Sequence, residues 1–147
     1  MAEIRLAKER ELLLLSKLDS SASLTPWSSE SYVSSFANPR HKIYVLVEAK
    51  QIIGAAILGF ALDEAEILQL WVKKELQQRG FGQILLLQII DIYKNPRIVD
   101  IFLEVRSDNT NALKLYEKLG FSHVGIRKNY YKVDGWTFDA ITMQKKL

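Results

Sequence analysis

Two groups of residues in the second half of this 147-residue sequence could do chemistry. The first is a glycine-bearing loop over residues 77–83, which follows a β-type run and precedes an apolar helical run. Glycines such as Gly80 and Gly82 let backbone N–H groups converge on an anion, and a helix N-terminus adds roughly half a positive charge. A pyrophosphate group is a natural ligand of such a loop. Taken alone, the loop is better explained as a tight turn that lets a strand and a helix pack closely.

The second group, Glu104, Asn109 and Tyr116, follows or ends the next β-type run. The Glu104 carboxylate is a candidate proton acceptor, since open α/β sheets collect ligands at the carboxyl ends of their strands. Each of the three residues also has a plain structural role. Glu104 could form an ion pair with Arg106, Asn109 could cap a turn or helix, and Tyr116 lies on an apolar stripe typical of a core helix.

The elements that must position these residues follow from hydrophobic periodicity and turn residues. In the first half we predict a short strand over residues 2–6, a helix over 7–18, a helix that begins after the N-cap Ser28 and ends before Pro39, and strands over 42–48, 52–62 and 64–73. The three strands have short links, which predicts an antiparallel meander.

In the second half we predict a helix over 84–93 that Asn95-Pro96 ends, a strand over 98–105, a helix over 110–119 followed by Gly120, and strands over 121–130 and 136–146 joined around Asp134-Gly135. The first of these helices is apolar nearly all round, so we expect it to be buried. The order strand, helix, strand makes 98–105 parallel to the strand before the glycine loop. We therefore expect one α/β domain over residues 1–147, with a central mixed sheet and helices on both faces.

Composition narrows the possible functions. The net charge of +3 suits a phosphorylated ligand but does not indicate a nucleic-acid platform. The sequence has no Cys and two His, which excludes disulfides, thiolate metal sites and a Cys nucleophile, so no metal site is predicted. No apolar stretch reaches the roughly 18 residues of a membrane span, and no cleavage site follows the N-terminal leucine run. We expect a cytoplasmic protein with no membrane or nucleic-acid partner.

The glycine loop and the residues after it together resemble the GNAT family of N-acetyltransferases, whose acetyl-CoA loop has the form Q/R-x-x-G-x-G/A. Gln77, Gly80 and Gly82 match that form. The likeness extends over nearly the whole chain to the bacterial ribosomal-protein-alanine N-acetyltransferases of the RimI type. The segments that carry this likeness are Pro26-Trp27-Ser28, Leu103-Glu104-Val105-Arg106, Asn109, Leu115-Tyr116, Gly120-Phe121, Arg127, Tyr130-Tyr131 and Asp139-Ala140.

The resemblance implies a GNAT fold and acetyl transfer from acetyl-CoA to the α-amino group of a protein N-terminus. The expected acceptor is the N-terminal alanine of ribosomal small-subunit protein eighteen. Glu104 would be the general base, Tyr116 the general acid for the departing thiolate, and Tyr131 would line the peptide entrance. The residues expected to bind acetyl-CoA are Leu70, Trp71, Val72, Gln78, Arg79, Gly80, Phe81, Gly82, Gln83 and Asn109.

The resemblance also predicts how the acetyl-CoA site is shaped. Residues 70–72 would bind pantetheine through their backbone, and the two parallel strands would splay apart to admit it. Trp27 and Asp139 would lie near the peptide entrance. Two residues depart from the family pattern: Trp71 replaces a small residue, which bears on the shape of the acceptor pocket, and Asp108 replaces the usual serine before Asn109.

Two alternative functions stay open. One is a GNAT acetyltransferase for lysine, polyamine or another small amine, against which Tyr130-Tyr131 and the overall pattern argue. The other is a non-catalytic acyl-CoA-binding module, against which the joint presence of Glu104 and Tyr116 argues. The absence of Cys favours direct transfer without an acetylated enzyme.

Overall fold

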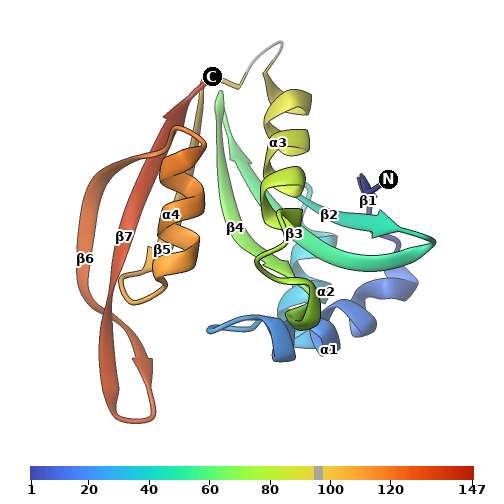
Figure 1. The fold of residues 1–147 in the computed structure, drawn as a ribbon, viewed down its shortest axis with the longest axis horizontal. Coiled ribbons are helices and arrows are strands. Elements are labelled where there is room, and N and C mark those ends of the chain that lie inside the picture. Colours follow the sequence, from blue (N-terminus) through green and yellow to red (C-terminus); the bar gives the residue numbers. More distant parts are fainter. Residues whose placement is uncertain (95–97) are drawn as a thin grey trace.

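The structure, a computed structural model, describes residues 1–94 and 98–147, which form a seven-stranded sheet (Figure 1). The strands lie in the order β1-β2-β3-β4-β5-β7-β6, and β4 and β5 pair in parallel while the other neighbours are antiparallel. The predicted meander and mixed sheet are therefore confirmed. The strands are β1 (Glu3–Leu6), β2 (His41–Glu48), β3 (Gln51–Ala61), β4 (Glu64–Val72), β5 (Asp100–Arg106), β6 (Ser122–Val133) and β7 (Trp136–Lys146).

Helices cover both faces of the sheet, as predicted. On β2, Tyr44 and Leu46 pack in one core cluster with residues of α3 and α4, whereas Ile43 and Val45 pack in the other with residues of α1 and α2. Successive side chains of a strand point to opposite faces, so each strand of the meander serves two cores. The helices are α1 (Leu12–Ala22), α2 (Ser29–Ala37), α3 (Phe81–Tyr93) and α4 (Thr110–Lys118).

Local turn and cap residues account for several predicted boundaries. The Ser28 hydroxyl accepts the N–H of Ser31 at 3.1 Å, which fixes the start of α2. Asp134 and Gly135 both have positive φ, and they join Val133 to Trp136 in the two-residue hairpin that the sequence predicted. The predicted end of α3 at Asn95-Pro96 lies outside the described residues.

The first predicted helix, over 7–18, is wrong at both ends. The N–H of Ala7 donates to the Ile43 carbonyl at 2.8 Å, so the chain there is still tied to β2. A 3-10 turn over Glu9–Glu11 follows, held by the Glu11 carboxylate, which accepts the Lys8 N–H at 2.8 Å and binds Arg5. The α-helix begins at Leu12 and continues to Ala22.

The prediction that the helix after the glycine loop is buried all round is also wrong. Leu85, Leu86 and Ile89 of α3 are buried, but Leu87 and Ile92 are 45% and 44% exposed. The helix forms the outer layer on its face of the sheet, so only one side of it meets the core (Figure 1). The helix is thus apolar on its solvent side as well as on its core side.

Strands β4 and β5 separate part of the way along their length, and this separation positions the site. Their parallel ladder runs from Glu64 beside Asp100 to Ile67 beside Leu103 and goes no further in the described residues. A bulge in β4 opposite Ile57 and Leu58 marks the same point. Figure 1 shows the two strands close at one end and apart at the other, so the predicted splay is present.

Candidate active site

A cleft of about 1010 Å³ lies where β4 and β5 separate. It is lined by the end of β4, the glycine loop, the first turns of α4, the end of β5, the α1–α2 connection and the tyrosines of β6. Two parts of its lining differ in chemistry. We call residues 70–72, Gln78, Gly80, Gly82, Gln83 and Asn109 the loop wall, and Glu66, Glu104 and Tyr131 the acidic wall.

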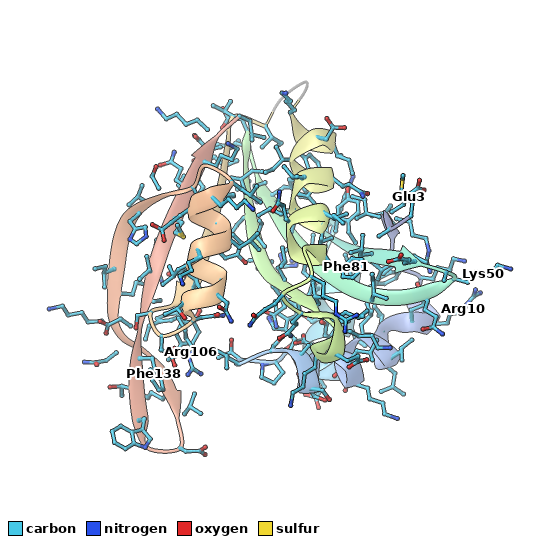
Figure 2. The ribbon with its side chains drawn as sticks, viewed as in Figure 1. Glu3, Arg10, Lys50, Phe81, Arg106 and Phe138 are labelled. Atoms are coloured by element: carbon cyan, nitrogen blue, oxygen red, sulfur yellow. The ribbon has the colours of Figure 1, made fainter. Side chains whose placement is uncertain are left out.

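The loop wall offers backbone rather than side chains. Gly80 is the N-cap of α3 with φ of +88°, and a Cβ built on it would meet no other atom within 4 Å. This open space lies beside the first N–H groups of α3, at the positive end of the helix dipole. Gln78, Gly80, Gly82 and Gln83 line the cleft as expected, whereas Arg79 does not. Phe81, the first residue of α3, does not line it either (Figure 2).

The end of β4 presents a free edge to the cleft. Beyond Ile67 this edge has no ladder partner from β5 among the described residues, so its backbone can pair with a ligand. Val72 is held instead by Gln77, whose Nε2 donates to the Val72 carbonyl at 2.9 Å. The Trp71 indole is buried, and its Nε1 donates to the Tyr32 hydroxyl at 2.8 Å, so the indole serves the core.

Asn109 has the structural role that the sequence allowed. Its Oδ1 accepts the N–H of Ala112 at 3.2 Å, which caps the N-terminus of α4, and the residue also lines the cleft. Along α4 the cleft lining includes two cations that the sequence reading missed, Lys114 and Lys118. Their spacing of four residues on one helix face is the signal that could have identified them.

Glu104 of β5 is held by one partner on the neighbouring strand β7 and one on β6, the strand beyond it. Arg127 Nε lies 3.0 Å from its Oε2, and the Thr142 hydroxyl donates to the same oxygen at 3.3 Å. The side chain remains 21% exposed, at the cleft surface. The suggested pairing of Glu104 with Arg106 is therefore wrong.

Arg106 has other partners. It forms a two-point contact with Asp108, with N–O distances of 3.0 and 2.8 Å, and its guanidinium lies over the Phe138 ring at 4.1 Å (Figure 2). This contact raises the pKa of Arg106 and lowers the pKa of Asp108, chiefly through the hydrogen bonds between them. Asp108, which replaces the family's usual serine, thus neutralises a cation at the cleft.

Tyr116 is buried on α4, with its ring edge-on to Phe121 at 5.7 Å. Burial raises the pKa of its hydroxyl to about 12, so the hydroxyl keeps its proton at neutral pH. Among the described residues no buried side-chain oxygen or nitrogen lacks a hydrogen-bond partner. The Tyr116 hydroxyl makes no hydrogen bond to the described residues, so its oxygen is not one of these fully buried atoms. It is therefore accessible from the cleft that Tyr116 lines. Its geometry suits a proton donor.

A bulge in β6 positions the tyrosine pair. The register passes from Arg127 beside Ala140 to Tyr131 beside Phe138, so the strand carries extra residues between them. Asn129 in this bulge has φ of 54°, and its N–H donates to the Asp139 carboxylate at 2.9 Å. Asp139 therefore holds the bulge that brings Tyr131 to the cleft. The sequence does not show that Asn129 adopts a left-handed conformation within this β-type run, so the bulge could be found only in the structure.

The α1–α2 connection is held by a buried carboxylate that the sequence reading missed. Asp19 is fully buried and accepts the Tyr32 hydroxyl at 2.6 Å, the Trp27 N–H at 3.2 Å and the Gln69 amide at 3.1 Å, and it also binds Ser23. Ser23 and Trp27 line the cleft, so Asp19 fixes part of the cleft boundary from behind. The acidic residue within a leucine-rich helix is the sequence feature that could have identified Asp19 as a buried carboxylate.

The chain belongs to the acetyltransferase (GNAT) family, which matches residues 12–121. It is therefore an acetyl-CoA-dependent N-acetyltransferase, and the predicted fold, family and enzyme class are confirmed. The site fits that donor: the open backbone at Gly80 suits a pyrophosphate, and the free edge of β4 suits the amides of pantetheine. The described residues contain no cluster of three or more potential metal ligands.

Individual relatives show which members of the family the chain resembles. The chain is 38% identical over 130 residues to a "[Ribosomal protein bS18]-alanine N-acetyltransferase" of Haemophilus influenzae, covering 88% of each chain. It is 35% identical over 118 residues to the Escherichia coli K12 protein of the same name, covering 80% of this chain and 79% of the relative. The crystal structure of the E. coli ribosomal-protein-S18-alanine N-acetyltransferase superposes with a TM-score of 0.92 at 31% identity, over 99% of this chain and 94% of that one. The predicted likeness to RimI-type enzymes is confirmed.

Proposed function

We propose that this enzyme acetylates the α-amino group of a protein N-terminus, and that its acceptor is the N-terminal alanine of ribosomal protein bS18. The observation that carries the proposal is the acidic wall at the point where β4 and β5 separate, beside a protonated tyrosine. Relatives at 35–38% identity whose names state this activity support it. Both substrates would be met in the cytoplasm, and we infer that compartment too.

Glu104 is the proposed general base. The acceptor arrives as an ammonium group, and it must lose one proton before its lone pair can attack a carbonyl carbon. An N-terminal amine has an ordinary pKa near 7.7–8.0, against about 10.4 for lysine, so a carboxylate can take this proton at modest cost. The partial exposure of Glu104 leaves room for a water molecule between the two groups.

Tyr116 is the proposed general acid. Attack by the amine forms a C–N bond and breaks the bond between the acetyl carbon and sulfur, whose electron pair stays on sulfur. The Tyr116 hydroxyl gives its proton to that sulfur and is reprotonated from the second proton that the new amide nitrogen loses. Overall the amine loses two protons, of which CoA thiol gains one and solvent the other.

The proposed acetyl-CoA residues fall into two groups. The backbone of Leu70, Trp71 and Val72 would hold the pantetheine arm, and Asn109 would support it from the start of α4. The glycine loop would hold the pyrophosphate through its N–H groups. The loop residues assigned to this role are Gln78, Arg79, Gly80, Phe81, Gly82 and Gln83.

Tyr131 is the proposed substrate-binding residue at the peptide entrance. Its ring lies at 85° to that of Tyr130, with centroids 5.2 Å apart, and both tyrosines line the cleft. We also propose that residues 1–147 act as one acetyltransferase domain, because the cleft draws its lining from β4 in the first half and from α4, β5 and β6 in the second.

A transfer assay with three acceptors tests the proposal. The acceptors are an alanine-starting basic peptide, the same peptide with a blocked N-terminus and a free lysine, and spermidine. We expect acetylation of the first, with mass spectrometry placing the acetyl group on the α-amino nitrogen. Faster transfer to the blocked peptide or to spermidine would contradict the proposed acceptor and favour the lysine or polyamine alternative.

A further inference from the structure

A second carboxylate stands beside the proposed base and has no assigned role. Glu66 lies on β4 next to Phe102 of β5, one residue before the parallel ladder ends. Paired residues of neighbouring strands share a face, and Phe102 shares its face with Glu104, two residues further on. Glu66 and Glu104 therefore project from the same face of adjacent strands, and both line the cleft.

The charges around this pair do not balance. Burial and the negative charge of Glu104 raise the pKa of Glu66, and the nearby Arg127 partly opposes the rise. Arg127 is bound to Glu104 at 3.0 Å, so two carboxylates share one guanidinium. Arg106, which lines the cleft, is neutralised by Asp108. Counted together with Arg127, the two carboxylates of the acidic wall therefore carry a net negative charge.

Glu66 does not serve the fold in any visible way. Neighbouring groups desolvate its carboxylate in part, but the residue still reaches solvent at the cleft. It makes no hydrogen bond or ion pair with the residues that the structure describes, whereas Glu104 has both kinds of partner. A carboxylate that is raised in energy by a like charge and lacks a partner is suited to a cationic ligand.

We propose that Glu66 is an acceptor-binding residue, which together with Glu104 binds the ammonium group of the incoming amine. This inference rests on the proposed function. An ammonium group has three N–H bonds. Two carboxylates on one face can accept hydrogen bonds from two of them, while the third points toward acetyl-CoA. Binding the ammonium offsets the repulsion between Glu66 and Glu104, which Arg127 relieves only in part in the free enzyme.

The two carboxylates then have different roles. Glu104 removes a proton and so acts on the rate of transfer, whereas Glu66 stabilises the charged acceptor before that proton leaves. Stabilising the ammonium form strengthens binding but also makes the proton harder to remove. Loss of Glu66 should therefore weaken acceptor binding without lowering the rate at saturating acceptor.

The test compares Glu66→Gln with Glu64→Gln at saturating acetyl-CoA and varied alanine-starting peptide. Glu64 is an exposed carboxylate on the same strand that does not line the cleft. We expect Glu66→Gln to raise the peptide KM about tenfold, the usual worth of one hydrogen bond to a charged group, with kcat unchanged or higher. Glu64→Gln should leave both constants unchanged, and Glu66→Asp should recover part of the affinity.

Two outcomes would overturn the proposal: an unchanged peptide KM in Glu66→Gln, or a fall in kcat that accompanies a fall in melting temperature. The proposed function fails separately, if the parent enzyme prefers the lysine peptide or spermidine. The Glu66 comparison then proceeds on that preferred amine, since each of these acceptors arrives as an ammonium group.

Discussion

The loop wall and the acidic wall meet in one cleft but are built differently. The loop wall offers mainly backbone: the space beside Gly80 is open, and among the described residues the edge of β4 is free of β5 beyond Ile67. The acidic wall consists of side chains from three strands, of which Glu104 is held by Arg127 and Thr142. Ligand binding by backbone groups survives a change of side chain but not a change of backbone conformation. Ligand binding by the acidic wall depends on the charge of its side chains. This difference indicates which substitutions should impair each wall.

The largest effect should follow from removing the proposed base. Glu104→Gln keeps the size of the side chain but cannot accept a proton near neutral pH. We expect kcat to fall roughly 10²–10⁴-fold, the usual contribution of a positioned base. The defect should shrink as the pH rises past the acceptor's own pKa, because more acceptor then arrives deprotonated. Steady-state rates from pH 6 to 9 measure it, and a pH-independent loss would point to a structural role.

Asp19 lies behind the cleft, and its hydrogen-bond partners lie outside both walls. Asp19→Ala leaves the Tyr32 hydroxyl and the Trp27 N–H without their acceptor, which should cost about 3 kcal/mol of unfolding free energy. Urea denaturation measures the loss, with Asp91→Ala on the exposed side of α3 as the control. Equal stability of the two variants would show that the Asp19 network does not hold the α1–α2 connection.

In the loop wall, a substitution that changes the backbone conformation should weaken CoA binding. Gly80→Val places a β-branched side chain at positive φ, where the loop approaches the proposed pyrophosphate, and we expect CoA affinity to fall on the order of 30-fold. Gly135→Val is the matched control, since Gly135 also has positive φ and open space around its Cβ position. Calorimetry should find normal CoA binding in the control. Equal losses in both variants would remove the glycine loop from the CoA site.

Removing the hydroxyl of the proposed general acid, Tyr116, should have the smallest effect on kcat. A free thiol has a pKa near 8.5, so a thiolate is not a poor leaving group at pH 7. Tyr116→Phe should therefore lower kcat only about tenfold, which is below the usual roughly 10²–10⁴-fold contribution of a general acid, and by less above pH 8.5. Stopped-time assays at pH 7 and 9 check this. A loss that grows with pH would contradict the role.

The two walls also differ in how far the sequence predicted them. The glycines of the loop wall lie in one short segment and could be predicted from local sequence, whereas the free strand edge and the splay of β4 from β5 were predicted through the family resemblance. In the acidic wall, Glu104 and Tyr131 were predicted through the family resemblance, but Glu66 was not, because the register of the parallel pair is what places it on the face of Glu104. The partner of Glu104 was missed for the same reason: Arg127 reaches it across β7, beside a bulge that no local pattern marks.

Helix boundaries show a similar limit. An apolar helix such as α3 reveals that it packs on a sheet but not which side stays in solvent. The start of α1 depends on Ala7 still pairing with β2 and on Glu11 closing a turn, both tertiary contacts. Ser28 and Asp134-Gly135 were predictable because a cap and a tight turn are decided within a few residues.

The separation of the two walls is tested most directly by titrating CoA calorimetrically into a Glu66→Gln/Glu104→Gln double variant. Neither carboxylate belongs to the loop wall, so we predict a CoA dissociation constant within about threefold of the parent value, alongside loss of peptide acetylation. A dissociation constant raised tenfold or more in a double variant that melts like the parent would contradict the separation.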